Sequence, residues 1–156
     1  MPKTAGKKAT AADADLMMKL YDLRRESEMR KARNWFATWN PQSFDDIMQL
    51  SMNFGSEENR WMRQVLTYWE NAESLVLRGA VHKDLFMDWN GELVFVYVKM
   101  KPWLKQIREF NDMPDWLAKV EQVATATPEL RKRVAWMESR FKKWAEMLKA
   151  KAAGKS

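Results

Sequence analysis

The clearest hydrophobic pattern lies near the C-terminus, where six apolar residues recur at alternating spacings of four and three: Leu130, Val134, Met137, Phe141, Trp144 and Leu148. This spacing puts a single apolar stripe on one side of an α-helix, as in coiled coils. Pro128 suits the first turn of that helix, because its missing amide would have no partner there. The pattern therefore predicts a last helix that packs along the whole stripe.

A first long helix is predicted to run toward Trp39 from Asp13 or Asp15, either of which can cap its start. Pro41 would end it, because a residue that precedes proline avoids the helical conformation. The apolar stripe of this helix changes phase across the polar residues 24–28. We therefore expect the helix to bend there or to pack its two halves on different neighbours.

Serine, glycine and proline residues delimit the next predicted helices. Ser43 can cap a short helix that ends near Gly55. Ser56 can cap a longer helix that ends near Gly79 and carries apolar residues over more than half of its circumference. That helix is expected to be central in the fold. Pro114 is expected in the first turn of another short helix.

The predicted helix from Lys83 to Met100 is the ambiguous segment of the chain, because of residues 93–98. Their sequence, LVFVYV, has strand propensity because its side chains are β-branched or aromatic. The chain has no second run of this kind, and a lone strand leaves its backbone groups unpaired unless another molecule pairs with it. We therefore predict a helix buried on all sides, which Pro102 kinks or restarts. An intermolecular strand is the alternative.

Together these elements predict an all-α fold, a single-domain helical bundle of about five to seven helices with flexible basic termini. The expected division is a basic flexible N-terminal tail over residues 1–12, a helical bundle domain over 13–150 and a flexible C-terminal tail over 151–156. Hydrophobic residues make up 46% of the chain, which excludes wholesale disorder. The low content of turn residues, 5 Gly and 5 Pro, argues against a β-sandwich or barrel.

The formal net charge of +6 is located mainly at the two ends. Residues 1–12 and 149–156 carry three lysines each and no acidic residue, whereas residues 13–148 hold 21 basic and 21 acidic residues. The chain has no cysteine, which excludes disulfides and thiolate sites and fits a reducing compartment. It shows neither a secretory leader nor a long apolar run. We therefore expect a cytoplasmic protein without a membrane span.

No catalytic or phosphate-binding motif is recognisable, so we expect no enzyme activity, no cofactor and no metal. Glu70 and Glu73 have a spacing found in di-metal bundles, but the only histidine, His82, lies in a predicted turn. A surface or capping role is expected for His82. Glu73 lies at the edge of an apolar stripe, where a general acid or base is conceivable. We expect instead an at least partly buried carboxylate paired with a basic residue of a neighbouring helix.

Trp136 lies about 120° away from the apolar stripe of its own helix, with basic residues one turn before and after it. Residues 129–156 hold nine basic and three acidic residues, whereas residues 13–128 have a net charge of −3. One interpretation is a docked ring covered by the aliphatic stems of basic side chains. The other is a partner-binding surface, for which the candidate residues are Lys132, Arg133, Trp136, Arg140 and Lys143.

Five short segments resemble a group of small bacterial helical proteins known as a domain of unknown function. They are residues 21–25, 29–33, 68–70, 78–81 and 84–86, with the sequences YDLRR, MRKAR, YWE, RGAV and DLF. The resemblance covers residues 15–125. It implies a bacterial helical domain, and it implies no activity, ligand or site residue.

The leading functional hypothesis is a non-enzymatic interaction module that makes protein-protein contacts or assembles, its partner an unknown protein or a second copy of the chain. The alternative is a sequence-independent nucleic-acid-associated protein, whose basic tails and basic C-terminal helix neutralise phosphates. An enzyme that acts through Glu73 in an internal pocket comes third.

Overall fold

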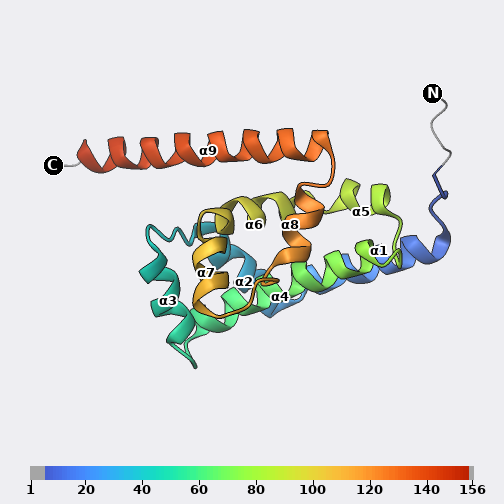
Figure 1. Ribbon diagram of the computed structural model, residues 1–156, viewed down its shortest axis with the longest axis horizontal. Helices are drawn as coiled ribbons and strands as arrows, with labels where there is room; N and C mark the ends of the chain where they lie inside the picture. The colour runs from blue at the N-terminus through green and yellow to red at the C-terminus, as the bar shows by residue number, and fades with distance from the viewer. Residues whose placement is uncertain (1–5, 155–156) are drawn as a thin grey trace.

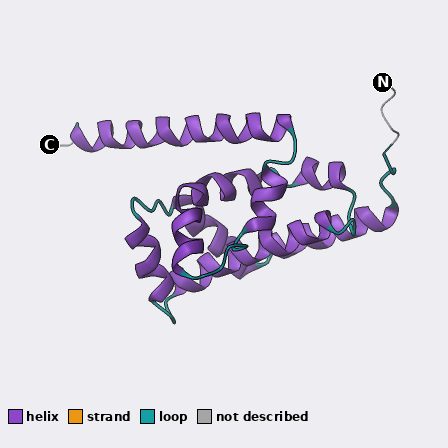
Figure 2. Ribbon diagram, in the orientation of Figure 1, coloured by secondary structure: helices purple, strands orange, loops and turns teal. Residues whose placement is uncertain are grey.

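The computed structural model describes residues 6–154, and helices are the only regular secondary structure in that part of the chain (Figures 1 and 2). The all-α prediction is therefore confirmed. The expected five to seven helices are too few, because breaks divide the first predicted helix near residue 26 and the predicted helix over 83–100 at residues 90–91. In chain order the elements are α1 (Ala11–Arg25), α2 (Ser27–Thr38), α3 (Phe44–Met52), α4 (Glu57–Leu77), α5 (Lys83–Trp89), α6 (Glu92–Met100), the 3₁₀ helix η1 (Lys101–Trp103), α7 (Leu104–Phe110), α8 (Ala118–Ala124) and α9 (Pro128–Ala153).

The change of phase in the first apolar stripe coincides with a break between α1 and α2. Glu26 has extended backbone angles, φ −56° and ψ 144°, and its carboxylate accepts a hydrogen bond from the backbone amide of Met29. Glu26 therefore caps α2 and turns the chain. The two halves bury separate stripes, with Met17 and Leu20 on α1 and residues that include Phe36 on α2.

Both ends of the helical region extend further than expected. Thr10, rather than Asp13 or Asp15, is the N-cap of α1, and Asp13 completes a reciprocal capping box with it. Residues 11 and 12, expected in the tail, are helical, and α9 continues to Ala153 through residues assigned to the C-terminal tail. Residues 6–10 and 154 are described and lie outside the helices, whereas tail residues 1–5 and 155–156 lie outside the described residues.

Helix α4 lies in the middle of the fold, as its broad apolar surface predicts. It packs against α2, α3 and α8, and the Trp69 side chain at its centre is completely buried. Residues 93–98 belong to α6, so the helix prediction for the ambiguous segment is confirmed. Most of α6 is buried, because α8 and α9 both pack against it.

The prediction that Pro114 begins a short helix is wrong. Residues 114–117 form turns, and α8 begins at Ala118 after Leu117, which has a left-handed backbone with φ 56°. The first amides of α8 are satisfied by Glu70 in α4, whose carboxylate oxygens lie 3.3 Å and 3.2 Å from the backbone nitrogens of Lys119 and Val120. A side chain from another helix thus supplies this N-terminal cap, which no local sequence pattern predicts.

Helix α9 runs along one side of the molecule, and its C-terminal half extends beyond α6 (Figure 1). The expectation that it packs along its whole stripe is wrong. Leu130 and Val134 are 7% and 5% exposed, whereas Trp144 and Leu148 are 45% and 62% exposed. The cause is length, because α9 spans about 39 Å and the nine-residue α6 beneath it only about 14 Å at 1.5 Å per residue.

Of the helices in residues 6–154, none is both long and apolar enough for a bilayer crossing.

Candidate interaction surface and buried polar contacts

The five candidate partner-binding residues all lie on the exposed surface of α9. Trp136 is 52% exposed, and the guanidinium carbon of Arg140 lies 5.3 Å from the centre of its ring. The structure therefore brings these two residues into a cation–π contact. Lys132 and Lys143 extend the same face at helical spacing, and Arg133 lies one residue further round, without a contact to the Trp136 ring. Trp136 is thus half-exposed, with the Arg140 guanidinium over its ring.

A second surface lies on the other side of α9, between its C-terminal half and the end of α2. It is a groove of about 390 Å³, lined mainly by apolar and aromatic side chains that include Trp39, Phe95, Phe141, Trp144 and Leu148. The rings are packed in series: Phe95 and Phe141 lie 5.2 Å apart edge to face, and Phe141 and Trp144 lie 5.6 Å apart. The C-terminal half of the apolar stripe of α9 thus lines this groove instead of packing in the protein core.

Lys99 is the charged residue that lines the groove. Its Nζ atom donates to three backbone carbonyl oxygens at the C-terminal end of α2, at 2.5 Å from Phe36, 3.2 Å from Ala37 and 2.5 Å from Trp39. It also lies 4.8 Å from the centre of the Phe95 ring. Burial lowers the pKa of Lys99 to about 8, which still leaves an ammonium group at neutral pH. This cation stabilises the negative end of the α2 dipole.

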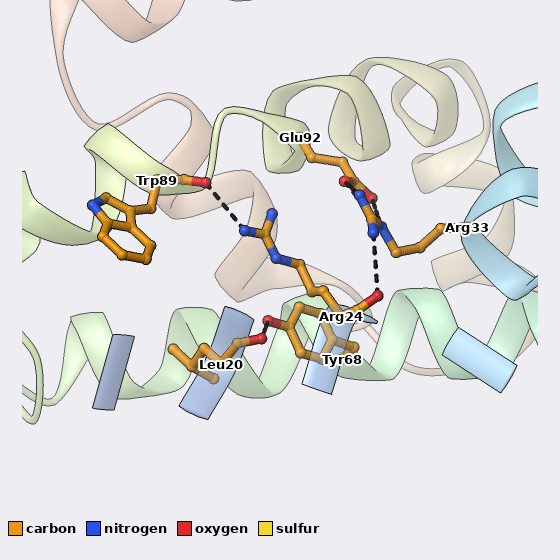
Figure 3. Close-up of polar contacts among 6 residues, drawn as sticks. All are labelled: Leu20, Arg24, Arg33, Tyr68, Trp89 and Glu92. Atoms are coloured by element: carbon orange, nitrogen blue, oxygen red, sulfur yellow. Dashed lines mark hydrogen bonds and ion pairs between the residues drawn. The ribbon is translucent and has the colours of Figure 1, made fainter. Parts of the chain in front are cut away.

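A network of polar contacts joins α1, α2, α4, α5 and α6 (Figure 3). Arg33 binds the Glu92 carboxylate through its Nε and Nη2 atoms and donates from Nη1 to the carbonyl oxygen of Arg24 at 3.2 Å. That carbonyl lies in the last turn of α1, where the break at Glu26 removes its helical partner. The ion pair therefore connects α2 to α6 and also satisfies the end of α1.

Arg24 and Tyr68 complete this network from opposite sides. Arg24 is 7% exposed, donates to the carbonyl oxygen of Trp89 at 3.3 Å, and places its guanidinium 5.6 Å from the Trp69 ring centre. The Tyr68 hydroxyl donates to the carbonyl oxygen of Leu20 at 2.8 Å, and burial raises its pKa to about 12. Both side chains contact backbone oxygens, which favours a structural role for this network.

Glu73 is completely buried, as expected in part, but the prediction of a basic partner is wrong. Neither of its carboxyl oxygens has a hydrogen-bond partner among the described residues, and the indole nitrogen of Trp69, one turn earlier, also lacks one. Burial, with a smaller contribution from the charge of Glu70, raises the pKa of Glu73 to about 9. Glu73 therefore carries a proton at neutral pH, because an unpaired charge in the core would cost more than neutralisation.

The predicted capping role of His82 is confirmed. Its Nδ1 atom accepts from the backbone amide of Leu85 at 3.3 Å, so His82 is the N-cap of α5. Its Nε2 atom lies 2.6 Å from the carbonyl oxygen of Lys7, and its own amide donates to Asp13. His82 thus connects the residues before α1 to the start of α5.

Sequence reasoning missed Lys99, the Arg33–Glu92 pair and the groove. Lys99 carried a signal that could have found it, because it is the one charged residue between Leu93 and Met100 in an otherwise apolar run. A charged residue in a buried helix needs a partner. The ion pair and the groove join segments far apart in the sequence, and periodicity carries no information about such pairs.

The chain matches a known family. Residues 9–127 match the family described as Domain of unknown function (DUF4760). The chain belongs to the DUF4760 family. Neither the curated proteins nor the solved structures contain a match to this chain.

The DUF4760 match includes α1 to α8 and leaves out α9. Helices α1 to α8, with the Arg24 and Arg33 contacts and Glu73, lie within the matched residues. Helix α9 begins at Pro128, one residue after the match ends. The exposed basic face and one wall of the groove therefore belong to a helix beyond the family domain.

Proposed function

We propose that this DUF4760 protein is a non-enzymatic interaction module, in which the family domain holds α9 and α9 contacts a protein partner. The observation that carries the proposal is the exposure of α9. Trp136 is 52% exposed beside Arg140, and Trp144, Met147 and Leu148 are between 45% and 68% exposed on the same helix. Exposed aromatic residues next to arginine are typical of the residues that dominate protein interfaces.

Three cations of the family domain, of which Arg24 and Lys99 are buried and Arg33 is partly exposed, support binding over catalysis. Arg24, Arg33 and Lys99 each donate to backbone carbonyl oxygens. Groups held in this way stabilise helix ends and are not free to transfer protons or bind a substrate. Glu73 has a strongly raised pKa, but it has no companion group that would complete a catalytic arrangement. These contacts therefore favour a structural role for the charged residues of the domain.

The candidate contact face consists of Lys132, Arg133, Trp136, Arg140 and Lys143. Its residues are exposed and follow one another along α9, so a partner can reach them without a change in the fold. The basic side chains would attract an acidic partner and raise the association rate. The Trp136 ring would supply most of the buried area.

A pull-down from native cell extract tests this function, with the full chain and a Trp136→Ala variant compared with and without nuclease. Protein partners should remain after nuclease treatment and be lost or reduced in Trp136→Ala. The matched control is Trp89→Ala, which alters a residue that is 41% exposed in α5 and does not belong to α9. Loss of every partner upon nuclease treatment would instead support nucleic-acid association through the basic residues. Equal partner recovery with both variants would remove the α9 face from the proposal.

A further inference from the structure

The groove between α9 and α2 has the features of a helix-binding site. Its upper wall is the second half of the four-three stripe, Phe141, Trp144 and Leu148, and its floor and opposite side are Phe95 and Trp39. The spacing of the stripe is that of a helix packed against another helix along its length. Within the described residues, the protein core covers only the first half of this stripe. In the second half, Phe141 still packs on Phe95 of α6, whereas Trp144 and Leu148 are 45% and 62% exposed.

The charge around the groove indicates which kind of helix would fit. Residues 138–153 hold five basic and two acidic residues, and the segment from Ala37 to Gln42 on the other side has no charged residue. At 100° per residue, Arg140 and Lys151 lie beside the exposed stripe on the same side. A helix seated in the groove would therefore lie next to positive charge, and acidic residues beside its own apolar face would complement it.

A second copy of this chain fits the groove poorly for the same reason. Pairing α9 with α9 would bring together two segments that each carry a net charge of +3 over residues 138–153. Like charges beside a helical interface destabilise the pairing. The charge pattern therefore favours a different protein over self-association.

We infer that the groove formed by Trp39, Phe95, Phe141, Trp144 and Leu148 binds an acidic amphipathic helix of a partner protein. The partner would place its apolar residues on the exposed stripe of α9 and its carboxylates beside Arg140 and Lys151. This inference rests on the proposed interaction function and identifies a surface and a partner chemistry for it. The groove and the Trp136 face lie on different sides of α9, and Arg140 borders both.

A designed peptide provides a probe for the groove. It has about five helical turns, leucine at four-three spacing and glutamate at the flanking positions, and its matched control has lysine in place of every glutamate. Binding of each fluorescein-labelled peptide to the full chain is measured by fluorescence anisotropy at two salt concentrations. The glutamate peptide should bind at least about tenfold more tightly than the lysine peptide, and added salt should reduce the difference.

Variants of the chain connect the binding to the groove. Leu148→Glu and Trp144→Ala alter residues that are 62% and 45% exposed, so both variants should stay folded, which a thermal melt checks. Each substitution should reduce the affinity for the glutamate peptide about tenfold or more. Leu23→Ala is the control, because Leu23 is 56% exposed and belongs to α1, which lies across the bundle from α9 (Figure 1). It should change the affinity less than about twofold.

Three results would overturn the inference: no binding of the glutamate peptide, equal binding of the lysine peptide, or unchanged binding by the Leu148→Glu variant. A concentration-dependent dimer of the full chain that Leu148→Glu dissociates, measured by light scattering, would assign the groove to a second copy instead. The proposed function fails separately, since it depends on native partners that require the Trp136 face. If the native partners are retained but the glutamate peptide does not bind, the groove inference is rejected and the proposed function is not.

Discussion

Arg33 in α2 forms a two-point ion pair with Glu92 at the start of α6, with its Nε atom 2.9 Å from one carboxylate oxygen and its Nη2 atom 2.5 Å from the other. The same guanidinium reaches the carbonyl oxygen of Arg24 at the end of α1. One side chain thus connects three helices, and it does so at the break that divides the first long helical segment.

Replacing Arg33 should therefore cost more stability than replacing its partner. Arg33→Met removes the ion pair and also the donor to the Arg24 carbonyl, whereas Glu92→Gln keeps a hydrogen-bond acceptor. Both side chains are partly exposed, so we expect a coupling of on the order of 1 kcal/mol from a double-mutant cycle in urea. Arg33→Lys should recover little, because lysine lacks the planar pair of donors. Equal losses for Arg33→Met and Glu92→Gln would contradict a role for the Arg24 contact.

Lys99→Met should destabilise the fold by about 1–3 kcal/mol, because three carbonyl oxygens at the end of α2 lose their donor. Methionine keeps most of the aliphatic volume, so the change isolates the ammonium group. Lys105→Met is the control, since the Lys105 side chain is 87% exposed. Chemical denaturation of both variants measures the difference. A change of less than about 0.5 kcal/mol for Lys99→Met would show that water replaces the ammonium at no cost.

Glu73 should make the protein less stable as the pH rises. Its pKa is raised from 4.5 in the unfolded chain to about 9, so between these values the folded protein holds a proton that the unfolded chain has released. The stability from this proton is fully present below pH 4.5 and is lost as pH rises toward 9. The free energy of unfolding should fall by about 1.4 kcal/mol per pH unit from this group.

Glu73→Gln should remove that slope, because glutamine stays neutral at every pH. Urea unfolding between about pH 5 and pH 7.5 measures the pH dependence of the unfolding free energy. This range lies below the lowered pKa of Lys99, about 8, above which Lys99 would make stability rise with pH. Glu109→Gln, an exposed carboxylate, is the control. If wild type and Glu73→Gln show the same pH dependence, Glu73 is ionised in the folded protein and the core accommodates its charge.

The two halves of α9 should contribute very differently to stability. Leu130→Ala should cost about 2–4 kcal/mol, since Leu130 is 7% exposed and packs on the core. Leu148→Ala should cost less than about 0.5 kcal/mol, because Leu148 is 62% exposed. Thermal unfolding of the two variants provides a matched comparison of one substitution at two positions of one stripe. A large loss for Leu148→Ala would mean that the C-terminal half of α9 packs on the bundle in solution.

Local features of this protein follow from the sequence by itself. The helical class, the capping serines Ser43 and Ser56 and the central position of α4 depend on short-range spacing and hydrogen bonds, which neighbouring residues encode. Residues 93–98 form a helix for a reason that the sequence also contains, since the chain offers no second strand to pair with them. The position of Trp136 off the apolar stripe likewise follows from its spacing, whereas its 52% exposure comes from the structure.

Only the tertiary structure decided how these helices use their side chains. The stripe of α9 is regular to Leu148, yet it is buried only as far as the short α6 extends beneath it. Glu73 has no basic partner among the described residues and Lys99 has three carbonyl acceptors, although both side chains are buried. Partners of this kind come from residues 60 or more positions away, and their approach depends on helix lengths and crossing directions that no local pattern records.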